Sequence, residues 1–150
     1  MIFSIIIAII AICADQATKW FFYGGVAKSI LGNVVWFEST LNTGVAFGMF
    51  ADSTLLFVFI SSIATVVFVY LMCSKKFLTS QYEKICLGVI MAGTFSNLLD
   101  RLMFGGVRDF IYLKFINFPI FNIADMCITI GVVLLCVYLI FKKPKKEDKW

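Results

Sequence analysis

Two aspartates in the second half of the chain, Asp109 and Asp125, have the residue type and spacing for paired acid–base chemistry. They lie on either side of a short connecting segment. A fold in which the chain turns back on itself there brings their carboxyl groups together. Two carboxyl groups about 3 Å apart do not both ionise readily, and they therefore share one proton and titrate as a pair. The ionised member takes a proton from water as it attacks a carbonyl, and the protonated member hydrogen-bonds to that carbonyl. The pattern predicts hydrolysis without an acyl-enzyme.

The composition excludes most other hydrolytic sites. The chain has no histidine, which removes Ser–His–Asp and Cys–His catalysis and most catalytic zinc sites. Its five cysteines lie within or at the edges of hydrophobic segments, so we expect packing residues and neither disulfides nor nucleophiles. We therefore expect no metal and no cofactor. The net charge of +4 does not indicate nucleic-acid binding, because the lysines gather where they fit topology signals.

The chain is predicted to be a single integral membrane domain over residues 1–150. It is 61% hydrophobic, which is too apolar for a soluble domain. Hydrophobic runs of about 20 residues predict four spans, near residues 2–23, 54–73, 84–104 and 120–141. The first run has the length of a signal-peptide core, but no basic start or small-residue cleavage site accompanies it, so we interpret it as a span.

Basic residues predict the orientation of these spans. The 74–84 connection and the tail 142–150 together hold eight lysines, against three basic residues in the other two connections. The positive-inside rule therefore places both of these segments and the N-terminus in the cytoplasm. Segments 24–53 and 105–119 then face outward. We expect the short basic tail to be disordered.

Polar clusters interrupt three of the four spans. They are Asp15 with Lys19, Asn97 with Asp100 and Arg101, and Asn122 with Asp125. Within each cluster the spacing of three or four residues places the side chains on one helical face. At a rise of ~1.5 Å per residue, all three clusters come close to the outer boundary of the bilayer. Charged groups in hydrocarbon are costly, so we expect these faces to turn inward and to serve a function. Burial there is also expected to raise the pKa of the carboxyl pair.

Structural roles for the charged clusters stay open on the sequence alone. Asp15 with Lys19 fits an ion pair within one helix. Asp100 beside Arg101 fits an internal charge arrangement that fixes helix packing.

The remaining polar residues leave a similar choice. Asn97 and Asn122 fit interhelical hydrogen bonds, and one of them is also suited to orient a catalytic carboxyl. Asp109, taken alone, fits an ordinary loop aspartate as well as a functional one. The functional interpretation is better for Asp125, because no opposite charge adjoins it in the sequence.

The outer segments predict a small β-rich cap over the bundle. Residues 32–33 predict a turn, and the β-branched and aromatic residues 34–37 are typical of a strand. Asn42-Thr43-Gly44 predicts a turn that leads into the apolar stretch 45–50, and residues 107–118 complete the cap. The predicted fold class is an all-α membrane protein with four transmembrane helices and a small outward-facing β-cradle or cap.

Five motifs occur in order along the chain. They are Asp15-Gln-Ala-Thr-Lys19, Asn42-Thr-Gly-Val-Ala-Phe47, Gly93-Thr-Phe-Ser-Asn97-Leu-Leu-Asp100-Arg101, Gly106-Val-Arg-Asp109-Phe110 and Phe121-Asn122-Ile-Ala-Asp125. With these motifs and four spans, the chain resembles the signal peptidase II family, the aspartyl endopeptidases that process bacterial lipoproteins. The motifs extend over residues 15–125 and the span pattern over residues 1–141.

The resemblance implies four transmembrane helices with a small β-cradle and a short interfacial helix on the outer side. It implies that Asp109 and Asp125 form the catalytic dyad. Structural or substrate-positioning roles are implied for the other motif residues, which are Asp15, Lys19, Asn42, Gly44, Asn97, Asp100, Arg101 and Asn122.

The resemblance also implies the setting of the reaction. The implied substrate is a diacylglyceryl-modified prolipoprotein, cut just before the lipidated cysteine. The implied location is the bacterial cell (inner) membrane, with the site near its outer face. We expect a monomer that meets this substrate and membrane lipid, and no nucleic acid.

Some positions depart from the family pattern. Ala92 and Ser96 stand where the third motif usually carries glycine. Arg108 replaces a usually apolar residue directly before Asp109, and Tyr112 stands where a second acidic residue is common. Both dyad positions are intact.

Two other classes of protein have intramembrane charges. A transporter or channel subunit is expected to hold polar groups near the midplane, often in repeated halves, whereas here they lie near the outer edge without repeats. The second class is a structural partner within a larger complex. Cleavage of a lipidated precursor by the purified chain separates both classes from a peptidase.

Overall fold

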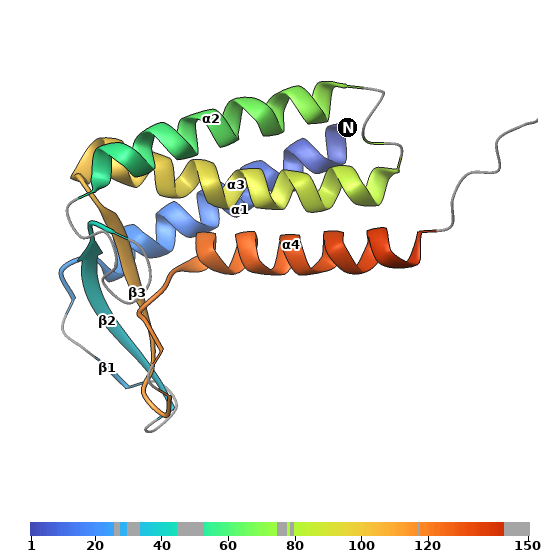
Figure 1. The fold of residues 1–150 in the computed structure, drawn as a ribbon. Coiled ribbons are helices and arrows are strands. Elements are labelled where there is room, and N and C mark those ends of the chain that lie inside the picture. Colours follow the sequence, from blue (N-terminus) through green and yellow to red (C-terminus); the bar gives the residue numbers. More distant parts are fainter. Residues whose placement is uncertain are drawn as a thin grey trace, which may run out of the picture.

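Four long helices form the body of the molecule (Figure 1). In this computed structural model residues 1–25, 28–29, 34–44, 53–74, 78, 80–116 and 118–142 are described. The helices are α1 (Ile2–Phe22), α2 (Thr54–Cys73), α3 (Gln81–Phe104) and α4 (Ile123–Phe141). Each is long and apolar enough to cross a membrane, which confirms the four predicted spans.

Two helices begin three residues away from their predicted starts, and local hydrogen bonds explain both shifts. The Glu83 N–H donates to Ser80 Oγ at 3.1 Å, and the Ser80 N–H donates to Glu83 Oε2 at 2.9 Å. This capping box starts α3 at residue 81. In contrast, α4 starts late because Phe121 is extended and pairs with Ile111.

Helix α3 is the central helix and packs against the other three. Glycines permit a close approach to α4. A Cβ at Gly93 would lie 2.3 Å from the Ala124 carbonyl oxygen, and one at Gly131 would lie 2.7 Å from Ile90 Cγ1. Because no larger side chain fits at such distances, the first turn of α4 is held directly against the middle of α3.

The predicted cap is a three-stranded antiparallel sheet in the order β1-β2-β3. Its strands are β1 (Lys28–Ser29), β2 (Val35–Asn42) and β3 (Val107–Leu113). The sheet projects from the end of the bundle where α1 ends and α4 begins (Figure 1). The register pairs Thr40 with Asp109 and Asn42 with Val107, after an irregularity between Phe37 and Thr40.

The cap differs from its prediction in extent. Strand β2 runs on to Asn42, well past the predicted end at residue 37, because β3 offers a partner along this whole length. The two-residue strand β1 was not predicted. The predicted turn at residues 32–33, the apolar stretch 45–50 and most of the basic tail lie outside the described residues.

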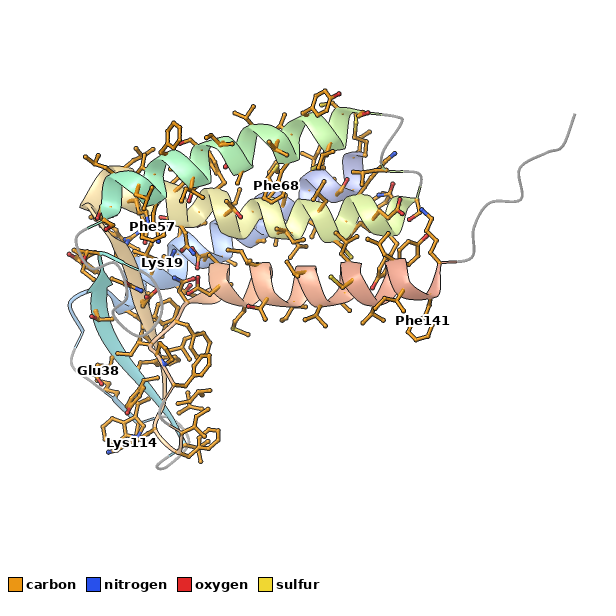
Figure 2. All side chains as sticks on the ribbon, viewed as in Figure 1. Lys19, Glu38, Phe57, Phe68, Lys114 and Phe141 are labelled. Carbon is orange, nitrogen blue, oxygen red and sulfur yellow. The ribbon has the colours of Figure 1, made fainter. Side chains whose placement is uncertain are left out.

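Aromatic side chains join the sheet to the bundle. The Phe22 ring at the end of α1 lies 4.1 Å from the Phe37 ring and 4.9 Å from the Phe110 ring, measured between centroids. Elsewhere the helices present apolar side chains outward, as expected for lipid contact (Figure 2). Lys19, by contrast, lies among the helices beside the sheet (Figure 2) and is 1% exposed.

Candidate active site

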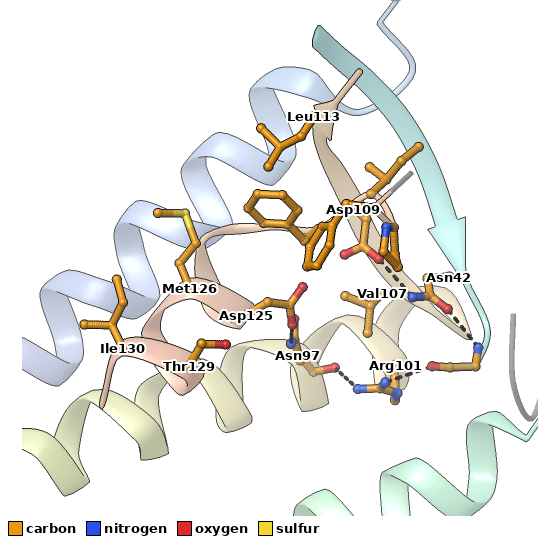
Figure 3. Close-up of a pocket in the computed structure, with 15 residues that line it drawn as sticks. Asn42, Asn97, Arg101, Val107, Asp109, Leu113, Asp125, Met126, Thr129 and Ile130 are labelled. Carbon is orange, nitrogen blue, oxygen red and sulfur yellow. Dashed lines mark hydrogen bonds between the residues drawn. The ribbon is translucent and has the colours of Figure 1, made fainter. Parts of the chain in front are cut away.

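A pocket of about 560 Å³ lies at the sheet end of the bundle, and Asp109 and Asp125 both line it (Figure 3). Asn42, Gly44, Asn97 and Arg101 are its other polar-motif members. The rest of the wall is mainly apolar and comes from β3, α4 and the segment that joins them: Val107, Leu113, Phe118, Pro119, Ile120, Phe121, Met126, Thr129 and Ile130. The structure thus brings into one cavity side chains that lie more than 80 residues apart in the sequence.

Asp109 is 2% exposed and lies on β3, opposite the end of β2. The Asn42 amide donates to Asp109 Oδ2 at 3.0 Å, and the Asn122 amide donates to Oδ1 at 2.5 Å. Burial, together with the negative charge of Asp125, raises the pKa of Asp109 to about 7, and these hydrogen bonds only partly oppose the rise. The predicted rise in pKa is therefore confirmed for this carboxyl.

Asp125 lies in the first turn of α4 and is half-buried. Asn97 Nδ2 donates to Asp125 Oδ1 at 2.8 Å, and the Asn122 backbone N–H donates to Oδ2 at 3.2 Å. The Asp125 N–H in turn donates to Asn122 Oδ1 at 2.9 Å. Asp125 is therefore a member of a capping box, and the backbone N–H groups at the start of the helix stabilise negative charge there.

Two asparagine side chains link the two carboxyls, and the orientation of both amides is fixed. Asn97 Oδ1 accepts hydrogen bonds from Lys19 Nζ at 2.8 Å and from Asn122 Nδ2 at 3.2 Å. Because these contacts occupy the Asn97 oxygen, its Nδ2 is directed at Asp125. The Asn122 oxygen is occupied by the N–H of residue 125, so its Nδ2 faces Asp109. The expectation that an asparagine orients a catalytic carboxyl thus has a geometric basis at both positions.

Lys19 lies at the centre of a buried network of charged and polar side chains below the pocket, called the support network from here on. Its Nζ lies 2.7 Å from Asp15 Oδ2 and 3.4 Å from Asp100 Oδ2, so the predicted pairing of Asp15 with Lys19 is confirmed. Asp15 also accepts from Ser96 Oγ at 2.7 Å and from the Ala124 N–H at 2.8 Å. Asp15 therefore ties α1 to both α3 and the start of α4.

Asp100 belongs to an internal charge arrangement, as expected, but Arg101 is not its ion-pair partner. The partners of Asp100 are Lys19 and Arg108, and Arg108 Nη2 lies 2.8 Å from Asp100 Oδ1. Adjacent residues on a helix point about 100° apart. Asp100 therefore faces α1 and β3, while Arg101 faces α2 and the pocket.

Arg101 is bound by weaker contacts. Its guanidinium donates at 3.4 Å to the carbonyl oxygens of Asn97 and Gly44 and lies 5.3 Å from the centre of the Phe57 ring. Its Nε is buried without a hydrogen-bond partner, and no carboxylate lies within ion-pair distance among the described residues. The Gly44 N–H donates to Asn42 Oδ1 at 3.0 Å, so the predicted turn at residues 42–44 orients the Asn42 amide toward Asp109.

Three members of the support network were not predicted: Gln16, Ser96 and Arg108. Gln16 Nε2 donates to Ser96 Oγ and to Asp100 Oδ1, each at 2.9 Å, while its Oε1 accepts from Arg108 Nη2 at 2.8 Å. An amide inside an apolar span was the available signal for Gln16, as it was for Asn97. The part of the chain that the structure describes has no cluster of side chains suited to hold a metal ion.

Fold and site together define a four-helix membrane protein with a two-carboxyl pocket at the end of the bundle that bears the sheet. The family model described as signal peptidase (SPase) II matches residues 7–141. The chain belongs to the signal peptidase II family. Its function is that of a lipoprotein signal peptidase.

Curated relatives named lipoprotein signal peptidase match most of the chain. The protein of Lactobacillus johnsonii is 35% identical, with 94% of each chain covered. That of Symbiobacterium thermophilum is 33% identical, with 95% of this chain and 97% of the relative covered. That of Campylobacter jejuni subsp. doylei is 44% identical over 73% of this chain and 70% of the relative.

Solved structures share the fold. One, described as a bacterial membrane enzyme determined by the in meso method at 2.3 Å resolution, gives a TM-score of 0.86 at 28% identity, with 100% of this chain and 94% of the other covered. A second, determined by the same method at 1.9 Å resolution, gives a TM-score of 0.81 at 28% identity, with 95% and 96% covered.

Proposed function

We propose that the chain is an aspartic endopeptidase that removes the signal peptide from diacylglyceryl-modified prolipoproteins, cutting just before the lipidated cysteine. The observation that carries this proposal is the placement of Asp109 and Asp125 on one pocket, joined through two oriented asparagines. Paired carboxyls in a pocket with mainly apolar walls supply both an acid and a base without a metal or a nucleophile.

The two carboxyls have different environments, and this assigns their roles. Asp109 is nearly inaccessible and has a pKa of about 7, so it carries the shared proton and hydrogen-bonds to the scissile carbonyl. Asp125 is more exposed and lies at a helix N-terminus, so it is the base that takes a proton from the attacking water. The leaving amine is then protonated from the pair, and no acyl-enzyme forms.

The lipid sets the depth of the substrate. The apolar wall of the pocket includes Met126 and Ile130 of α4, both of which are exposed on a membrane-crossing helix. Acyl chains in the surrounding bilayer thereby place the neighbouring peptide bond at the pocket. Each CH₂ kept in hydrocarbon contributes about 0.8 kcal/mol, so two acyl chains fix this depth without a sequence-specific peptide site.

The setting proposed for this reaction is the bacterial inner membrane. We place both termini in the cytoplasm and the sheet and pocket at the outer face. The reason is that eight lysines lie in the segments 74–84 and 142–150, which the positive-inside rule assigns to the cytoplasm. In this arrangement the pocket meets exported precursors, and a single copy of the chain suffices for the reaction.

The test compares one precursor peptide with and without its diacylglyceryl group, at equal detergent concentration, with purified wild-type protein and the Asp109→Asn and Asp125→Asn variants. We expect the wild-type protein to cut only the lipidated peptide. Neither variant should cut it, and the double variant should be little worse than either single one, because the pair acts as a unit. Equal rates on the two peptides would contradict the lipid requirement, and substantial cleavage by either variant would contradict the dyad.

A further inference from the structure

Arg108 is a buried cation beside the pocket whose Nε and Nη2 have hydrogen-bond partners, while its Nη1 has none among the described residues. It is 2% exposed. Its Nη2 and Nε approach the two oxygens of Asp100 at 2.8 and 3.3 Å, and its backbone N–H donates to Asp100 Oδ2 at 2.9 Å. The guanidinium also lies 4.1 Å from the centre of the Phe104 ring and donates to Gln16 Oε1.

These contacts cross the turn between α3 and β3. Helix α3 ends at Phe104, Gly105 adopts φ +73, and β3 begins at Val107. Asp100, near the end of α3, therefore binds both the side chain and the backbone of Arg108, the second residue of β3. The next residue along that strand is Asp109, so the same contacts fix the position of the Asp109 backbone relative to α3.

Arg108 also completes a charge balance. The support network contains two buried carboxylates and two buried cations that are joined by ion pairs. The carboxylates are Asp15 and Asp100, and the cations are Lys19 and Arg108. Without Arg108 the support network would have an excess of one negative charge below the pocket. Unbalanced charge in a low-dielectric region is felt over longer distances than in water.

We propose that Arg108 is a positioning residue for the reaction: by clamping the start of β3 onto α3 through Asp100, it holds Asp109 in register with Asp125. The role rests on the function proposed above for those two carboxyls. The Asp100 carboxylate and the Gln16 amide are the hydrogen-bond partners of the Arg108 side chain in this clamp. A planar guanidinium suits this place, because two of its nitrogens bind the two oxygens of one carboxylate in parallel, which the single nitrogen of an ammonium group cannot do.

The charged groups around Asp109 come from four elements, and they determine the expected pH response. Helix α1 contributes Asp15 and Lys19, α3 contributes Asp100 and Arg101, β3 contributes Arg108, and α4 contributes Asp125. Strand β2 contributes the neutral Asn42 amide, while its Glu38 is exposed. Loss of the Arg108 charge makes ionisation of Asp109 less favourable, so the pH–activity profile should move to higher pH.

The experiment measures kcat, KM, the pH–activity profile and the thermal midpoint of purified Arg108→Met, Arg108→Lys and Asp100→Asn/Arg108→Met proteins. Lys114→Met is the matched control, since Lys114 is exposed and lies over the Trp36 ring. For folded Arg108→Met we expect kcat to fall by at least about tenfold, because a displacement of about 1 Å can cost a hundredfold. KM should change little, and the profile should shift upward. The lysine variant should regain the pH profile but only part of kcat.

The double variant separates position from charge. It removes one carboxylate and one cation, so its pH profile should return to that of the wild type while kcat stays low. A wild-type kcat in either methionine variant, or a loss of kcat fully accounted for by the unfolded fraction, would overturn the proposal. If Arg108→Met does not fold, full activity in Arg108→Lys overturns it. Asp109→Asn is measured in parallel: cleavage by that variant refutes the dyad itself, whereas failure of the Arg108 variants alone refutes only the clamp.

Discussion

Replacing Asp109 with asparagine is expected to abolish cleavage and, at the same time, to make the fold less sensitive to pH. Asparagine keeps the shape of the side chain but cannot exchange a proton. In the wild-type protein, burial and the charge of Asp125 raise the pKa of Asp109 from an ordinary 3.8 to about 7. The position therefore favours the neutral form, which agrees with the proposed role of Asp109 as the carrier of the shared proton.

The sign and size of the stability effect follow from this shift. A carboxyl whose pKa is higher in the folded state contributes stability that is complete below its unfolded pKa and is lost as pH rises through its folded pKa. One pKa unit corresponds to about 1.4 kcal/mol, so the full loss is roughly 4 kcal/mol, of which roughly 3 kcal/mol falls between about pH 5 and pH 8. Asparagine does not titrate, so this part of the pH dependence should disappear in the variant. If the new amide group forms poor hydrogen bonds with Asn42 or Asn122, the variant is less stable at every pH. This loss does not change how much its stability differs between about pH 5 and pH 8.

The measurement is the midpoint of thermal unfolding in detergent micelles, followed from mildly acidic to mildly alkaline pH. Glu38→Gln is the matched control, because it makes the same chemical change at an exposed position on β2. The wild-type and control midpoints should fall with rising pH more steeply than the Asp109→Asn midpoint. Parallel curves for all three proteins would show that folding does not raise the pKa of Asp109, and would refute this reasoning.

Three further outcomes are expected. Arg101→Ala should lose cleavage while its thermal midpoint stays close to that of the wild type, since Arg101 makes no ion pair among the described residues; a large drop in the midpoint would return it to a scaffold role. Gly93→Ala should destabilise the protein by about 1–3 kcal/mol, because its Cβ would lie 2.3 Å from the Ala124 carbonyl oxygen, and an unchanged midpoint would contradict the close helix contact. In a cysteine-free background, a cysteine at Ser39 should react with an impermeant thiol reagent from outside, and one at Ser80 only after the membrane is opened; reversed labelling would place the pocket in the cytoplasm.

The spans and the clustering of polar residues were predictable from the sequence because bilayer thickness and helix rise leave little freedom. Asp15 and Lys19 lie four residues apart on one helix, and this spacing predicts the ion pair that they form. The inward direction of Asn97 followed from the cost of an amide in lipid. Such constraints act within a single helix, and they need no knowledge of how the helices are placed around one another.

The partners across elements were not predictable in the same way. Asp100 has a cation beside it in the sequence, yet it pairs with Arg108 on the far side of a turn. That choice depends on the path of Gly105 and on where β3 begins, neither of which is encoded in local periodicity. The bond from Asp15 to the Ala124 N–H is a similar case, because it joins the two most distant helices in the sequence.

Helix α2 stands apart from all of this chemistry. It packs against α3, its only buried residue is Met72, and its polar contacts at the pocket end are those of Thr54. Beyond its first turn, where Phe57 lies under the Arg101 guanidinium, its outward-facing side chains are mostly apolar and exposed, as lipid contact requires. For protein engineering, this makes α2 the natural place for labels, crosslinkers or fusion anchors. Because so few of its side chains are buried, one apolar residue can replace another on this helix with little loss of packing.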